Sequence, residues 1–272
     1  MLNKVVVITG ASGVLCAEFA RDLAGKGYHL ALIARHEETL LPIMHDIENS
    51  GGISRIYPAD VTDENEVRAA HDKIRTELGP CDILINGAGG NHPCCITDSE
   101  FFDGKVQDGK TFFNMTREGF SHVFDLNLWG TVLPCQIFSE DMIGRDGCCI
   151  LNISSMAAYS PLTKTPAYCA SKAGISNFTQ WLAVHLAPAG IRVNAIAPGF
   201  FLTNQNRTLL ANKDGSPKPR AAKIISQTPM RRLGNPRELL GSLEFLIDET
   251  KSGFMTGCIL PVDGGFSAYS GV

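Results

Sequence analysis

Short apolar runs alternate with longer amphipathic stretches along most of the chain. The short runs are rich in Val, Ile and Leu, and most are continuous instead of alternating with polar residues, which is typical of strands buried on both faces. This pattern predicts seven strands, at residues 4–9, 28–34, 53–58, 82–86, 149–154, 191–197 and 257–262.

The stretches between these strands have helical spacing, and several begin at Ser, Thr, Asp or Asn, which commonly cap helix N-termini. Strands that alternate with helices predict βαβ units with right-handed crossovers. We therefore expect an α/β fold with one domain over residues 1–272, a doubly wound parallel sheet of seven strands with helices on both faces. The helices are predicted at 14–25, 37–49, 64–78, 118–143, 164–187 and 236–248.

Two segments interrupt this alternation. Residues 90–116 and 198–220 are long, contain many Gly, Asn, Asp and Pro residues, and each follows the carboxyl end of a predicted strand. Because ligands of open α/β sheets bind at that edge, we expect both segments to form walls or lids of a site.

The composition restricts the classes of partner. The chain has 272 residues, 44% of them hydrophobic and 19% charged, which is ordinary for a globular protein. Its formal net charge of −4 lacks the basic excess that general nucleic-acid binding requires, so no nucleic-acid partner is expected. No apolar run approaches the ~18 residues that cross a bilayer, so we expect a soluble protein without a membrane partner.

The nine cysteines are expected to be thiols in a reducing cytosol. Their number is odd, and residues 1–10 run into the first strand without the features of a secretion signal. The adjacent pairs Cys94-Cys95 and Cys148-Cys149 lack the spacing of a zinc site, so we expect buried thiols and no metal.

The first predicted strand leads through a glycine-containing turn directly into a helix. Glycine lets the backbone approach a pyrophosphate, whose charge is stabilised by the free N–H groups at the helix N-terminus. A tight turn without a ligand is the alternative. The residues expected to contact the phosphates are Thr9, Gly10, Ser12, Gly13, Val14 and Leu15.

Two further segments at the same edge are candidate cofactor contacts. Asp60 and Val61 follow the third strand, and the Asp60 carboxylate could accept a hydrogen bond from an adenine amino group. Asn86, Gly87, Ala88 and Gly89 follow the fourth strand, where small residues bring the backbone close to a ribose. The alternatives are a helix cap or turn at Asp60 and a simple glycine turn at 86–89.

A third group combines Tyr168, Lys172 and the serines Ser154 and Ser155 at the end of the fifth strand. Tyr168 and Lys172 are four residues apart and share one helix face. An ammonium group near a phenol lowers the pKa of the phenol, which makes it a usable proton donor and acceptor. In isolation, such a pair could equally be a surface pair.

In order and spacing, these motifs resemble the short-chain dehydrogenase/reductase family across nearly the whole chain. Pro198, Gly199 and Thr203 also fit the family's PGxxxT stretch near the nicotinamide, and residues 262–265 fit its last strand. The remaining counterparts of family motifs are Thr9-Gly10, Asp60, Asn86 to Gly89, Asn127, Ser155, Tyr168 and Lys172.

The resemblance implies a Rossmann-type domain that catalyses hydride transfer between a nicotinamide and a carbonyl or alcohol. Tyr168 would be the acid/base, and Ser155 would hydrogen-bond the reacting oxygen. Lys172 would hold the nicotinamide ribose and lower the pKa of Tyr168, while Asn127 would support a water linking Lys172 to solvent. The resemblance also implies a homotetramer built on the helices at 118–143 and 164–187 and the C-terminal tail.

The phosphate turn departs from the family pattern. TGxxxGxG would place glycines where this chain has Val14 and Cys16, and Gly13 stands one position early. The departure concerns the fine geometry of the turn and not its role. The variant turn and several other segments resemble a narrower group, the D-mannonate oxidoreductases or fructuronate reductases. Those segments are residues 86–93, 177–182, 197–203 and 263–272.

The end of the second strand bears on the choice of cofactor. Ala34 stands where an acidic residue would select NAD, and the Arg35 guanidinium suits the extra phosphate of NADP. We predict that NADP is accepted and slightly favoured over NAD. Alternatively, Arg35 stacks on adenine in solvent while NAD serves.

A sugar-acid substrate needs a cation and several polar groups in its pocket. The hypothesis is a cytosolic NAD(P)-dependent oxidoreductase that interconverts D-mannonate and D-fructuronate. Alternatives are another sugar-acid or polyol dehydrogenase, such as gluconate 5-dehydrogenase, and a nucleotide-sensing protein without catalysis. Phe200, Phe201 and Trp129 are expected to pack instead of recognising substrate. The candidate substrate contacts are Asn91, His92, Lys164, Gln205, Asn206 and Arg207.

Overall fold

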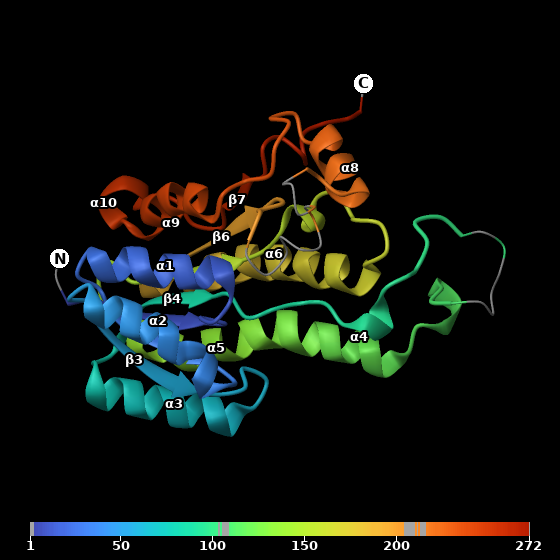
Figure 1. Cartoon of the computed structure of the whole chain (residues 1–272). Helices are drawn as coiled ribbons and strands as arrows, with labels where there is room; N and C mark the ends of the chain where they lie inside the picture. Colours follow the sequence, from blue (N-terminus) through green and yellow to red (C-terminus); the bar gives the residue numbers. More distant parts are fainter. Residues whose placement is uncertain are drawn as a thin grey trace.

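Seven parallel strands form one sheet in the order β3-β2-β1-β4-β5-β6-β7, with helices on both faces (Figure 1). The computed structural model describes residues 3–102, 104, 109–203, 210, 212 and 216–271. The doubly wound α/β fold is thereby confirmed. The strands are β1 Val5–Thr9, β2 His29–Ala34, β3 Ile53–Pro58, β4 Cys81–Asn86, β5 Cys149–Ile153, β6 Arg192–Pro198 and β7 Ile259–Val262.

The helices agree with the predicted positions except in four places. The predicted helix at 118–143 is divided by a π-helix at Asp125–Trp129 and ends in a 3₁₀ turn, and the one at 236–248 begins as a 3₁₀ turn. Two helices were not predicted: α8, which begins at the end of the second loop, and the short α10. The α-helices are α1 Val14–Gly25, α2 Glu37–Asn49, α3 Glu64–Glu77, α4 Arg117–Phe124, α5 Gly130–Phe138, α6 Pro166–Leu186, α8 Pro219–Gln227, α9 Leu240–Ile247 and α10 Glu249–Ser252.

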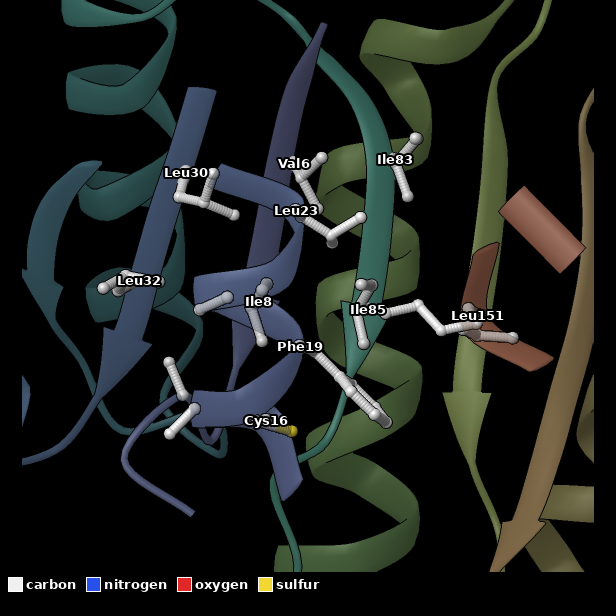
Figure 2. Packing of buried hydrophobic residues seen from close by; sticks show 14 of the residues in the cluster. Val6, Ile8, Cys16, Phe19, Leu23, Leu30, Leu32, Ile83, Ile85 and Leu151 are labelled. Carbon is white, nitrogen blue, oxygen red and sulfur yellow. The ribbon is translucent and has the colours of Figure 1, made fainter. Parts of the chain in front are cut away.

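Two hydrophobic layers hold the helices to the sheet. Helices α1, α2 and α9 pack on one face, and α3, α5 and α6 pack on the other. In the first layer, Phe19 and Leu23 of α1 lie over Ile8 of β1 and Ile85 of β4, and all four side chains are fully buried (Figure 2). Central strands buried in this way explain why the apolar runs in the sequence are continuous.

The segment between β4 and α4 projects away from the body of the molecule (Figure 1). We call its described residues 97–102 and 109–114 the arm. The arm carries four exposed aromatic side chains, Phe101, Phe102, Phe112 and Phe113. The arm belongs to the segment 90–116 that was expected to form a wall or lid of the site. The contacts of the arm therefore determine which part of the site this segment borders.

The cysteine prediction is confirmed for Cys95, Cys148 and Cys149, which are buried free thiols, whereas Cys94 is exposed. Within the described ranges, no helix is both long and apolar enough to cross a membrane. Those same ranges contain no group of three or more His, Cys, Asp or Glu residues suited to hold a metal ion.

Candidate active site

The turn after β1 packs tightly on the turn after β4. Gly10 has φ +62°, and a Cβ on it would lie 2.6 Å from the backbone nitrogen of Ala88. The Thr9 hydroxyl accepts hydrogen bonds from the backbone N–H groups of Gly87 (3.2 Å) and Ala88 (3.4 Å). Position 10 therefore requires glycine, both for its backbone conformation and for this close approach.

Cys16 fills space beneath this pair of turns. Its thiol is buried and lies against Gly87 so closely that a Cβ at Gly87 would overlap the sulfur. Burial raises the pKa of the Cys16 thiol to about 12, so the thiol is neutral packing material. The missing glycine at position 16 is thus accommodated by the glycine at position 87.

A cavity of about 220 Å³ opens above these turns, between the ends of β1, β2, β3 and β4. It joins eight of the predicted cofactor residues: Gly10, Ser12, Gly13, Arg35, Val61, Gly87, Ala88 and Gly89. The lining residues that the sequence analysis did not propose as contacts are Ala34, His36, Thr39, Ala59 and Leu126.

Several other predicted contacts do not line this cavity. The Thr9 side chain is buried in the turn, and Val14 and Leu15 form the first turn of α1. The Asn86 amide points into the core, where it donates to the Asn152 oxygen at 2.9 Å. The Asn86 side chain therefore ties β4 to β5, and only the backbone after it reaches the cavity.

Asp60 borders the cavity without lining it. Its carboxylate accepts hydrogen bonds from the Thr62 N–H (2.9 Å) and hydroxyl (2.7 Å), as in the alternative turn interpretation. Burial opposes ionisation, but these hydrogen bonds and the charges of Arg35 and His122 outweigh it, so the pKa of Asp60 lies below its usual range.

The turn after β6 is built close to β7. Gly199 follows Pro198, the last residue of β6, and donates its N–H to the Val262 oxygen at 2.9 Å. A Cβ at Gly199 would lie 2.6 Å from the Asp263 Cα, so this position also needs glycine. Thr203 is the last described residue before the gap in the second loop.

The structure brings together the three residues of the predicted proton-handling group. Tyr168 and Lys172 lie one turn apart on α6, with the Lys172 Nζ 5.7 Å from the centre of the Tyr168 ring. Lys172 is buried and donates to the Ile153 oxygen at the end of β5 (2.8 Å). Ser155 stands two residues after Ile153, and its hydroxyl is hydrogen-bonded to Tyr168.

The expected lowering of the Tyr168 pKa is wrong for this structure. Burial raises the pKa of Tyr168, and the hydrogen bond with Ser155 only partly opposes that effect. Burial also lowers the pKa of Lys172 to about 8. The prediction considered only the ammonium charge and omitted the cost of removing both groups from water, which is the dominant cause here.

Asn127 lies in the π-helix and faces the turn after β4. Its amide nitrogen donates to the Gly90 oxygen (2.7 Å) and the Val123 oxygen (2.8 Å), and its oxygen accepts from the Gly90 N–H (3.2 Å). A Cβ on Gly89 would lie 2.7 Å from the Asn127 oxygen and 3.2 Å from the Lys172 Nζ. Both side chains therefore border the same glycine.

The candidate substrate residues are dispersed. Asn91 accepts from the N–H of His92 (2.9 Å), and His92 accepts from the N–H of Cys94 (3.3 Å), so His92 caps a loop. Lys164 has φ +71°, and its ammonium donates a hydrogen bond to the backbone carbonyl oxygen of Asp98 in the arm at 2.6 Å. Gln205, Asn206 and Arg207 lie outside the described residues.

Replacing Lys172 with methionine is expected to increase stability at pH 7. Because its pKa is lowered from 10.5 to about 8, the unfolded chain binds more protons than the folded one between these values, and stability rises with pH through that window. The free-energy cost of burying the charged Lys172 ammonium is fully present below pH 8. Replacing the lysine with methionine removes this cost and should add about 1–3 kcal/mol to the free energy of unfolding at pH 7.

Urea unfolding at pH 7 and near pH 10 measures this effect. The gain should shrink towards pH 10, where the wild-type lysine is neutral in the folded state. Lys73→Met, at an exposed position on α3, is the control and should show no such pH dependence. A Lys172→Met variant less stable than the wild type at pH 7 would contradict the argument.

Comparison with known proteins places this geometry in context. A sequence model described as short chain dehydrogenase matches residues 4–214. An uncharacterised oxidoreductase of Bacillus subtilis strain 168 is 50% identical over 272 residues, which cover 100% of this chain and 98% of the relative.

Two solved structures are informative. A proposed D-mannonate oxidoreductase from Haemophilus influenza, solved with bound NAD, has a TM-score of 0.96 at 50% identity and covers 100% of this chain and 98% of its own. A gluconate 5-dehydrogenase from Burkholderia cenocepacia, in complex with NADP and tartrate, has a TM-score of 0.82 at 27% identity and covers 98% and 96%.

Proposed function

Because this chain belongs to the short-chain dehydrogenase family, we propose that it is an NAD(P)-dependent oxidoreductase that interconverts D-mannonate and D-fructuronate. The observation that carries the proposal is the grouping of Ser155, Tyr168 and Lys172 beside a cavity lined by glycine turns. A fold alone would not suffice, since one fold hosts many functions.

The residues around the cavity fit a dinucleotide. Gly10 and Gly13 add no side chain at two positions of the turn before α1, so that backbone N–H groups at the helix N-terminus can bind the pyrophosphate. Asp60 would accept from the adenine amino group, and Gly89 leaves room for the nicotinamide ribose beside Lys172. When bound, the nicotinamide supplies or receives the hydride.

The remaining steps belong to the protein. Tyr168 donates its proton to the oxygen of the carbonyl substrate during reduction and accepts it back during oxidation. Ser155, hydrogen-bonded to Tyr168, stabilises the charge that develops on that oxygen. Lys172 holds the ribose and supplies positive charge beside the phenol, and Asn127 would support a water that links Lys172 to solvent. Pro198, Gly199 and Thr203 would line the nicotinamide end.

The substrate assignment is supported by likeness to the D-mannonate oxidoreductase proposed for Haemophilus influenza. The gluconate 5-dehydrogenase, which covers nearly the whole chain, supports another sugar acid as the second candidate. The intact catalytic group argues against a non-catalytic nucleotide sensor, because a sensor would not need Ser155, Tyr168 and Lys172 together.

Absorbance of the reduced nicotinamide tests the proposal. With D-fructuronate as substrate, the purified protein should oxidise the reduced nicotinamide. The kcat/KM for D-fructuronate should be at least about tenfold higher than the kcat/KM for 5-keto-gluconate, because a matched pocket discriminates between stereoisomers. The reverse order would favour the gluconate alternative. Cofactor binding without turnover of any sugar acid would favour the sensor.

The cofactor is proposed to be NAD or NADP, with Arg35 contacting the extra phosphate of NADP. Replacing Arg35 with glutamine should raise KM for NADP about tenfold and change KM for NAD little, since only NADP offers a phosphate to the guanidinium. Arg55→Gln, on β3 and outside the cavity lining, is the control. Equal changes with both cofactors would contradict this role.

We also propose a homotetramer in which the face of α6 is covered. Phe178, Trp181 and His185 form a stack on that face, with 6.4 Å and 4.9 Å between successive ring centroids. Trp181 is 59% exposed and Val184 is 78% exposed. A face of this kind is typical of a protein–protein contact.

A further inference from the structure

A cluster of charged side chains joins three segments of the chain. Glu100 of the arm forms an ion pair with Lys223 of α8. Next to it, the Lys164 ammonium donates a hydrogen bond to the backbone carbonyl oxygen of Asp98 (2.6 Å). The backbone carbonyl of Lys164 accepts a hydrogen bond from the Thr97 N–H (3.0 Å). The arm base is thus fastened to α8 on one side and to the loop before α6 on the other.

Among the described residues, this cluster carries more positive than negative charge. The hydrogen bond from Lys223, together with the charges of Lys223, Lys164 and Arg220, holds the pKa of Glu100 below its usual range. The Asp98 carboxylate is directed into the arm, where it accepts from the Lys110 N–H (2.8 Å). Three cations thus lie near two carboxylates, and Glu100 is the carboxylate that pairs with Lys223, in a protein with a net charge of −4.

The cluster is connected to the catalytic tyrosine. Lys164 stands four residues before Tyr168, and its left-handed backbone is unusual for a residue with a side chain. Ile224 of α8 packs in the same hydrophobic cluster as Phe200, and Phe200 also packs against the cluster that Tyr168 contacts. Leu162, two residues before Lys164, packs against that second cluster as well, so the segments that carry Lys164 and Lys223 both adjoin the surroundings of Tyr168.

We propose that Lys164 and Lys223 bind the carboxylate of an anionic substrate and that Glu100 competes with that carboxylate for the Lys223 ammonium group. This inference rests on the proposed function and identifies the substrate class that the site selects: an acid whose carboxylate lies several carbons from the reacting carbonyl. Glu100 occupies the Lys223 ammonium until the substrate replaces it, and a neutral polyol gains nothing from the two lysines.

Two variants that break the same ion pair separate this role from a structural one. Lys223→Met removes a cation and should raise KM for D-fructuronate at least tenfold with kcat within twofold. Glu100→Gln removes the competitor and should lower KM for D-fructuronate severalfold. If the ion pair only fastened the arm, both variants would shift KM in the same direction, and the proposal would be overturned.

Further arms of the experiment control for charge and folding. Lys251→Met, on α10 and paired with Asp248, should leave KM unchanged. A neutral ketose, D-fructose, is tested as substrate or inhibitor, and its constants should not respond to either variant. An equal response to the neutral sugar overturns the carboxylate assignment. A wild type that turns over no sugar acid overturns the proposed function instead, and thermal melts establish that each variant is folded.

Discussion

Replacing Tyr168 with phenylalanine is expected to lower kcat about a thousandfold or more, since a positioned acid/base typically contributes 10²–10⁴-fold. Only the hydroxyl is removed, so the ring that packs against the cluster of Met156, Ala157 and Cys169 is kept. The reacting oxygen then has no acid/base partner, and the Ser155 hydroxyl cannot replace it because a serine alcohol is a weak acid. Steady-state rates with D-fructuronate measure the loss.

Two controls isolate the phenol. Tyr159→Phe removes a hydroxyl that donates to the Ile259 oxygen at 3.0 Å, away from the catalytic group, and should retain nearly full activity. Nicotinamide fluorescence should report an almost unchanged Kd for the cofactor in Tyr168→Phe. If kcat fell less than tenfold, Tyr168 would not be the acid/base, and a different group would have to carry the proton.

Replacing Gly87 with alanine is expected to disrupt the cofactor turn and destabilise the fold. The new methyl group would overlap the Cys16 sulfur and lie 3.0 Å from the Thr9 oxygen. Crowding of this kind in a packed site costs about 1–3 kcal/mol. Because Gly87 also lines the dinucleotide cavity, KM for the cofactor should rise at least tenfold as the backbone shifts.

A second substitution should reverse much of this loss. In Gly87→Ala with Cys16→Ala, the nearest Cys16 atom left is its Cβ, 3.7 Å from the added methyl. Urea unfolding of both single variants and the double variant gives the coupling energy, which should be favourable by about 1 kcal/mol or more. Gly241→Ala, with no atom within 4 Å of its added Cβ, is the control. Strictly additive effects would show that the sulfur is not the obstacle.

Much of the architecture follows from the sequence because its signals are local. Apolar runs predict the seven strands of the sheet, and the spacing of Tyr168, Lys172 and Ser155 predicts a group of side chains that the structure assembles. The segments that were not predicted depend on contacts. Helix α8 begins at Pro219, at the end of a proline-containing loop. It is held in place because Ala221 and Ile224 pack in one hydrophobic cluster with Phe200, Leu202 and Leu233.

The pKa shifts of the site residues were harder to predict than the identity of those residues. The four-residue spacing indicates that Lys172 lies near Tyr168. It does not indicate how deeply the two side chains are buried. Desolvation depends on the whole surrounding structure, and it reverses the expected sign for Tyr168. The pairing of Cys16 with Gly87 was equally hidden, because the two residues are distant in sequence and meet only after β1 and β4 have paired.

The π-helix at Asp125–Trp129 also constrains how the gene can change. Its wider turn accommodates a residue beyond a regular helical turn, and the Asn127 amide takes the Val123 oxygen that the ladder would otherwise use. Deleting one residue there would convert the wide turn to a regular helical turn and leave Leu133 and Ile137 in the interior, whereas a deletion within α5 would rotate the residues beyond it by about 100°. Descendants of this chain can therefore shorten the π-helix at the expense of the Asn127 position more readily than they can shorten α5.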